Sequence, residues 1–192
     1  ATPPRGSALT GALQPLDPLL KWAGGKRWLL PHLAPLWARH SERRLVEPMA
    51  GGLAVTLGLM PARALANDIN PHAVNFYRQV RDGLDIDCEM SNDSAFYYAA
   101  RDEFNALIRA GLPECRRAAQ LFFYLNRTGY NGLCRFNRKG EFNVPFGRYA
   151  RLNYARDFAA HRAVFARWEF RCGDFETLPL DSGDFVYADP PY

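Results

Sequence analysis

Four short apolar runs divide the chain, and an acidic residue follows each run within two positions. The runs cover residues 45–46, 64–66, 168–172 and 184–188. Runs of this length are typical of strands, and the last one, rich in aromatic and β-branched residues, indicates a buried strand. Segments with helical periodicity lie between the runs. The pattern therefore predicts an α/β fold with a Rossmann-like sheet.

The longer segments repeat their apolar residues at helical spacing. They predict helices over residues 28–37, 53–59, 71–80, 94–110, 116–126 and 156–166. Asn70 is a suitable cap for the third of these, and Pro71 fits its first turn. Gly111 is typical of the end of the fourth. The aromatic residues of this fourth helix, residues 94–110, indicate packing rather than a binding role.

A basic hairpin is predicted after the fifth helix. Residues 133–137 and 141–144 flank the turn 138–140, which is typical of two short strands joined tightly. Basic residues gather around it: Arg127, Arg135, Arg138, Lys139, Arg148, Arg151 and Arg156. This density favours a polyanionic partner such as DNA. A surface hairpin that merely carries charge explains the composition equally well.

A glycine turn and an acid suggest a nucleotide-like cofactor. Residues 47–52 read Glu-Pro-Met-Ala-Gly-Gly and join the first predicted strand to a helix, while Asp68 ends the second strand. In Rossmann-like units such a turn lets a ligand approach the backbone, and such an acid binds a ribose. Together they favour an adenosine-containing cofactor. Gly24-Gly25, between Lys21 and Lys26, suit either a phosphate loop or an ordinary turn.

Asp189-Pro190-Pro191-Tyr192 follow the last apolar run. A carboxylate at the carboxyl end of a strand lies where open α/β sheets bind their ligands. The Asp189 carboxylate and the Pro190 carbonyl could accept both hydrogens of an exocyclic amine, and Tyr192 could stack on its ring. A strand that ends in an ordinary proline turn could have the same four residues. The choice between an amine-binding site and such a turn therefore depends on the rest of the chain.

Composition sets the remaining bounds. The chain has 192 residues, 48% of them hydrophobic, and a formal charge of +4, which suits one domain with a core. No apolar run approaches the length of a membrane span. Residues 1–17 read as a flexible tail on a cytoplasmic protein. The four cysteines form no C-x-x-C pair, so neither a metal nor a disulfide is expected.

Five motifs in order carry a family resemblance: L-K-W-A-G-G-K, L-V-E-P-M-A-G-G, N-D-I-N, N-G-L-C-R-F-N-R-K-G-E-F-N-V-P-F-G-R-Y and D-P-P-Y. The chain resembles the Dam-type (D12 class) adenine-specific DNA methyltransferases from residue 19 to residue 192. The resemblance implies transfer of a methyl group from S-adenosylmethionine to a flipped-out adenine of double-stranded DNA, in the site GATC.

The resemblance also implies residue roles. The cofactor would contact Trp22, Lys26, Glu47, Gly51, Asp68, Asp174, Phe175 and Asp189, with Asp68 on the ribose and Asp174-Phe175 at the adenine. The target site would contact Lys21, Tyr130, Asn131, Arg135 and Pro145, with Arg127 and Arg148 near phosphates. Asp189, Pro190 and Tyr192 would form the catalytic pocket, and no metal is required.

The implied organisation is a tail over 1–17, a catalytic domain over 18–70 and 157–192, and an inserted helical and β-hairpin target-recognition subdomain over 71–156. Met49 and Leu53 depart from the residues usual in the glycine turn, which predicts altered packing of the cofactor. Family members continue after D-P-P-Y, so we expect that the C-terminal part of the sheet is missing and that the natural protein is longer.

Two other classes stay open. A methyltransferase acting on RNA or on a protein glutamine could use a related motif, although it would not need the basic hairpin. A non-catalytic DNA-binding fragment is the second alternative. The sequence leaves the oligomeric state and any pairing with a restriction enzyme undetermined.

Overall fold

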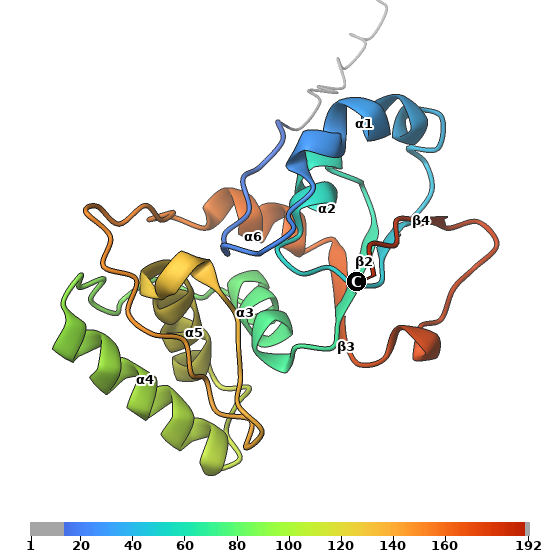
Figure 1. Ribbon diagram of the computed structural model, residues 1–192. Helices are drawn as coiled ribbons and strands as arrows, with labels where there is room; N and C mark the ends of the chain where they lie inside the picture. Colours follow the sequence, from blue (N-terminus) through green and yellow to red (C-terminus); the bar gives the residue numbers. More distant parts are fainter. Residues whose placement is uncertain (1–13, 191–192) are drawn as a thin grey trace, which may run out of the picture.

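Four short parallel strands form the sheet at the centre of the molecule. The computed structural model describes residues 14–190 and has mixed α/β architecture (Figure 1). The strands are β1 (Leu45–Glu47), β2 (Ala64–Asp68), β3 (Trp168–Cys172) and β4 (Phe185–Val186), in the order β3-β2-β1-β4. Parallel strands are usually joined by helical crossovers. One such crossover joins β1 to β2, and another joins β2 to β3.

The register brings the carboxyl ends of the strands to one edge. Leu45 lies opposite Ala64 of β2 and Phe185 of β4, and Asp68 at the end of β2 lies opposite Cys172. The Rossmann-like part of the predicted fold agrees with this parallel sheet. Ligands of such sheets bind at the carboxyl edge.

The last strand is shorter and less buried than predicted. β4 contains two residues rather than the five of 184–188, and Val186 is 45% exposed. Within the described residues it pairs with β1 alone. Arg44 fixes its entry by binding both carboxylate oxygens of Asp184, at 2.9 and 2.7 Å. The continuation expected beyond residue 192 stays a prediction.

The helices lie close to where the sequence predicts them. They are η1 (Arg27–Leu29), α1 (Leu30–Ala38), α2 (Ala54–Leu59), α3 (Pro71–Arg81), α4 (Ser94–Arg109), α5 (Arg116–Thr128), η2 (Tyr130–Gly132), α6 (Ala159–Phe165) and η3 (Phe175–Thr177). The Asn70 side chain caps α3 as expected, accepting from two backbone N–H groups. α6 begins three residues later than predicted, because the Asp157 side chain binds the N–H of Ala159 at 2.8 Å and closes a local turn.

The crossover from β2 to β3 holds α3, α4, α5 and α6. In Figure 1, α3 lies between α5 and the strands, and α4 lies on the outer side of α5. α3 contacts both the sheet and α5: Tyr77 stacks on Phe170 of β3, while Phe76 stacks on Phe123 of α5. A subdomain boundary at residue 71 thus falls before a helix that both parts share, and this division stays a prediction.

The predicted hairpin forms one isolated bridge instead of two regular strands. Phe136 pairs with Phe142, and Asn137 and Glu141 close the turn through a 2.8 Å backbone hydrogen bond. A side chain of α4 binds the outer edge of this hairpin. Asn105 accepts from the N–H of Phe142 at 2.8 Å and donates to its carbonyl at 3.0 Å. Residues 133–144 are called the basic arm below. The outer edge of this arm is therefore satisfied by a side chain, and no further strand is needed.

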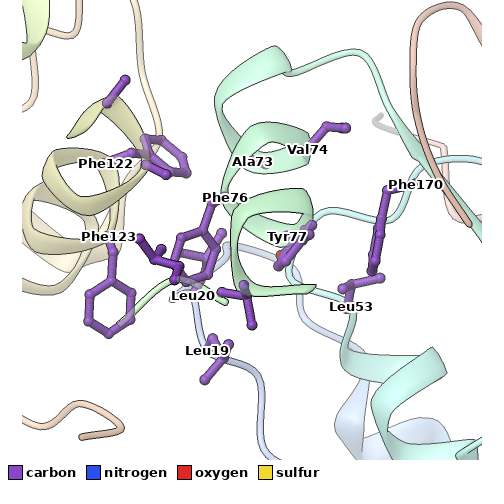
Figure 2. Packing of buried hydrophobic residues seen from close by; sticks show 14 of the residues in the cluster. Leu19, Leu20, Leu53, Ala73, Val74, Phe76, Tyr77, Phe122, Phe123 and Phe170 are labelled. Carbon is purple, nitrogen blue, oxygen red and sulfur yellow. The ribbon is translucent and has the colours of Figure 1, made fainter. Parts of the chain in front are cut away.

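Aromatic side chains fill the space between the helices and the sheet. Figure 2 shows Phe122 and Phe123 of α5 on one side of α3, with Leu53 and Phe170 on the other. Phe76 is 0% exposed and contacts three further rings, those of Tyr77, Phe123 and Phe158. This layer joins the helices between β2 and β3 to the strands that build the site.

We predict that Phe76→Ala lowers the free energy of unfolding by about 3–5 kcal/mol, because it leaves a cavity in this close-packed layer. Urea denaturation followed by circular dichroism measures the loss. Phe175→Ala is the matched control: its ring is 55% exposed, so a change within about 0.5 kcal/mol is expected. Equal effects of the two variants would show that the layer does not stabilise the fold.

Candidate active site

A cavity of about 850 Å³ lies at the carboxyl ends of the strands. All eight residues predicted to contact the cofactor line it: Trp22, Lys26, Glu47, Gly51, Asp68, Asp174, Phe175 and Asp189. Pro190 lines it as well, while Tyr192 lies outside the described residues. Residues from both ends of the chain therefore meet in one space, although their individual roles stay predictions.

The glycine turn after β1 is fixed by hydrogen bonds from two elements. The N–H of Gly51 donates to the Asp68 carboxylate at 2.7 Å, and the Tyr77 hydroxyl donates to the Gly51 carbonyl at 2.6 Å. Gly51 has φ +48°, and a Cβ there would lie 2.6 Å from Nε1 of Trp22. A side chain at this position would thus displace the indole, so the close approach requires glycine.

Asp68 organises the turns around it. Its second oxygen accepts from the N–H of Asn70 at 2.9 Å, and the residue is 8% exposed. Both carboxylate oxygens are therefore already held by backbone amides. Each retains a further lone pair, so binding of a ribose hydroxyl pair is chemically compatible with this geometry and stays a prediction.

Glu47 is buried on the wall of the cavity. Its carboxyl group accepts from the N–H of Thr56 at 3.3 Å and forms a short hydrogen bond with the Thr56 hydroxyl. Burial raises the pKa of Glu47 to about 8, and the negative charges of Asp189 and Asp68 add to the rise. At neutral pH this carboxyl is therefore largely protonated.

Lys26 joins the Gly24-Gly25 loop to the predicted catalytic segment. Its ammonium lies 2.7 Å from the Asp189 carboxylate and donates to the Gly24 carbonyl at 2.8 Å. The two charged side chains are 20% and 25% exposed. Lys26 thus holds Asp189 in a fixed place beside the glycine turn.

Apolar side chains surround the open side of the cavity. Phe175 is 55% exposed, and Ile69 is 76% exposed directly after Asp68. Leu180 and Val186 also line this side. Of these four, the sequence analysis identified Phe175 only. The lone apolar residue in Asn-Asp-Ile-Asn is the signal that could have revealed Ile69.

Five of the predicted target-contacting residues, Tyr130, Asn131, Arg135, Pro145 and Arg148, follow α5 and do not line the cavity. Tyr130 is 50% exposed, and its N–H donates to the carbonyl of Pro145 at 2.8 Å, so these two lie together. Arg135 is exposed and donates from Nε to the Asn143 side chain at 2.8 Å. Asn131 and Arg148 are also exposed, both with positive φ.

Lys21 and Arg127 have internal contacts that the sequence could not reveal. The Lys21 ammonium lies 3.7 Å from the centre of the Tyr149 ring and 3.3 Å from the Arg127 carbonyl. The Arg127 guanidinium donates to the carbonyls of Pro18 and Leu19, and burial lowers its pKa. These contacts hold Arg127 against the segment before Lys21, and its predicted phosphate contact stays a prediction.

The family model of the D12 class N6 adenine-specific DNA methyltransferases matches residues 22–192. The chain belongs to this family. The assignment confirms the resemblance carried by the five motifs, which reach from the Gly-Gly loop to the segment at Asp189.

Curated relatives agree with the D12 assignment. A DNA adenine methylase of Haemophilus influenzae is 39% identical over 91% of this chain, and the retron Ec67 DNA adenine methylase of Escherichia coli is 37% identical over 92%. The chain spans 63% and 64% of these relatives, less than two thirds of their length. A protein of Methanocaldococcus jannaschii named type II methyltransferase M.MjaIII is 33% identical over 92% of the chain.

The described part of this D12-class chain holds no cluster of three or more His, Cys, Asp or Glu side chains arranged for a metal ion. Residues 14–190 also contain no helix with the length and apolar character that crossing a membrane demands.

We predict that Glu47→Gln reduces the loss of stability on raising the pH from about 5 to 8. The folded pKa of about 8 lies above the ordinary value of 4.5, so folding takes up a proton in this window. Stability contributed by the neutral acid is complete below the lower value and is lost as pH rises towards the upper one, by at most about 1.4 kcal/mol per unit.

Urea midpoints at several pH values test this linkage. Glu103→Gln is the matched control, because Arg117 lowers the pKa of Glu103 and this residue should leave the slope between pH 5 and 8 unchanged. If Glu47→Gln keeps the slope of the unsubstituted chain, Glu47 is ionised in the folded protein and its assigned protonation state is wrong.

Proposed function

We propose that this chain carries the cofactor site, the target-reading loops and the catalytic segment of a site-specific DNA adenine-N6 methyltransferase. The donor is S-adenosylmethionine, and the acceptor is an adenine in double-stranded DNA, within GATC. The observation that carries the proposal is the meeting of Asp189 and Pro190 with Gly51 and Asp68 around one cavity.

The cavity suits S-adenosylmethionine by its donor set. Asp68 offers a carboxylate to the ribose, and the exposed apolar faces of Ile69 and Phe175 suit the two sides of an adenine ring. The glycine turn provides close backbone approach for the methionine part. When bound, the cofactor supplies a methyl group on a sulfonium, which is already a strong electrophile.

The catalytic step assigns the chain two tasks, holding the amine and orienting it. The Asp189 carboxylate and the Pro190 carbonyl accept the two N–H hydrogens, which leaves the nitrogen lone pair directed at the methyl carbon. Lys26 keeps Asp189 in place through the 2.7 Å ion pair. Holding reacting atoms about 3–3.5 Å apart supplies a large part of the rate.

An adenine inside a duplex cannot reach this cavity and has to be flipped out, at a cost of a few kcal/mol. Tyr130, half exposed on its own turn, is suited to fill the gap left in the stack. Arg135 lies on the exposed basic arm, where a guanidinium can read a guanine in the major groove. The basic arm favours a DNA substrate over a protein glutamine.

Replacing Asp189 tests the catalytic role. We predict that Asp189→Ala lowers methyl transfer to a GATC duplex by at least about 100-fold, because one acceptor aligned with the reacting amine is lost. Transfer of radiolabelled methyl groups measures the rate, and fluorescence anisotropy checks that duplex binding survives.

Asp181→Asn is the control, an exposed carboxylate in the same segment. Retained activity in Asp189→Ala would falsify the catalytic assignment. Transfer by the unsubstituted chain to RNA or protein, with none to DNA, would favour the other methyltransferase class. Duplex binding without cofactor binding would favour a DNA-binding module.

Replacing Arg135 tests target reading. We predict that Arg135→Ala loses about 1–3 kcal/mol of discrimination at one base pair of the site, as expected for a bidentate contact with guanine. Competition binding with duplexes changed at one pair at a time measures this. Lys139→Ala, at the exposed turn of the arm, should instead weaken binding to all duplexes alike. A uniform loss for Arg135→Ala would make Arg135 a phosphate contact.

A further inference from the structure

Asn126 forms a two-point clamp on the segment that leads into the cavity. It lies near the end of α5 and is 1% exposed. Its side-chain oxygen accepts from the N–H of Lys21 at 2.8 Å, and its amide nitrogen donates to the carbonyl of Lys21 at 2.8 Å. The pair copies the bonding of a neighbouring strand, so the peptide groups at Lys21 cannot move without breaking buried hydrogen bonds.

The same amide also faces the turn that carries the predicted target readers. Its nitrogen lies 3.5 Å from the carbonyl of Gly132, the last residue of η2. Gly132 has φ +61°, and a Cβ there would overlap the Lys21 side chain. Lys21 and Gly132 are therefore in direct contact, and Asn126 touches both of them.

The two segments joined at this point lead to different sites. Trp22 follows Lys21 and packs on Gly51 and Gly52 in the cavity. Tyr130 and Asn131 precede Gly132 and are exposed on the target-reading side. Asn126 therefore ties the backbone next to Trp22 to the backbone of the turn through buried hydrogen bonds.

We propose that Asn126 is a positioning residue that couples the cofactor cavity to the target-reading turn, so that cofactor and DNA each strengthen the binding of the other. This inference rests on the proposed function. Coupling of this kind is reciprocal by thermodynamic necessity, and typical values correspond to changes in affinity of about 5- to 150-fold.

Calorimetry measures the coupling directly. The dissociation constant of S-adenosylmethionine is determined for the chain alone and with a saturating GATC duplex whose target adenine is replaced by an abasic site. No base can then enter the cavity, so any coupling passes through the protein. For the unsubstituted chain we expect affinity to rise at least about fivefold with the duplex.

Asn126→Asp keeps the acceptor for the N–H of Lys21 and loses the donor to the carbonyls of Lys21 and Gly132. We expect its affinity ratio to fall to about one, a change that loss of stability alone would not produce. Asn105→Asp is the matched control, because Asn105 clamps Phe142 in the same two-point manner on α4. It should retain the ratio of the unsubstituted chain.

Hydrogen exchange on the unsubstituted chain gives a second readout that needs no variant. Addition of S-adenosylmethionine should slow exchange at the N–H of Leu133, which donates to the carbonyl of Tyr130 at 3.1 Å within the turn. Both ligands binding without coupling, or a ratio preserved in Asn126→Asp, overturns the inference and leaves the proposed function intact. Failure of either ligand to bind the unsubstituted chain overturns both.

Discussion

The hydrogen bond from the N–H of Gly51 to the Asp68 carboxylate is the interaction on which the site depends. It joins the turn after β1 to the end of β2 at 2.7 Å, in a place where both groups are buried. A charged acceptor in such surroundings forms a strong bond, and its loss would leave a buried charge poorly satisfied. Because the bond fixes the turn, Trp22 can pack on Gly51, and Lys26 can reach Asp189 from the loop beyond.

The same geometry determines which charged groups face one another in the cavity. The described lining of the cavity holds four carboxylates, Glu47, Asp68, Asp174 and Asp189, against the single cation Lys26. Crowded acids under burial do not all stay ionised, and Glu47 with its pKa of about 8 is the group that keeps its proton. A cavity with surplus negative charge suits a sulfonium better than a neutral thioether, which is consistent with a methyl donor.

The sequence revealed the parts of the fold that local pattern determines. The apolar runs and the Asn70 cap predicted β1, β2, β3 and α3 to within two residues. The five motifs, taken in order, predicted which residues line the cavity. The pattern predicted a longer and more buried β4 than the structure has. Five residues do not show which segments pack against them. The sequence also did not reveal the internal contacts of Arg127, because a long side chain can point to either side of its helix. The internal partners at Pro18 and Leu19 lie far away in sequence, and no spacing rule connects them.

Buried asparagines explain how the irregular loops of this fold are held firmly in place. Asn67 donates to the carbonyls of Pro48 and Gly173, Asn105 binds both backbone groups of Phe142, and Asn126 does the same for Lys21. The amides of Asn105 and Asn126 each take the place of a neighbouring strand, and all three amides satisfy backbone groups. A side chain binds the backbone at one or two points, whereas a strand binds it along its whole length. A loop held by a side chain can therefore stay irregular. The segment between β2 and β3 can therefore carry exposed Tyr130 and Arg135 on short irregular stretches while its buried side stays fixed to the helices.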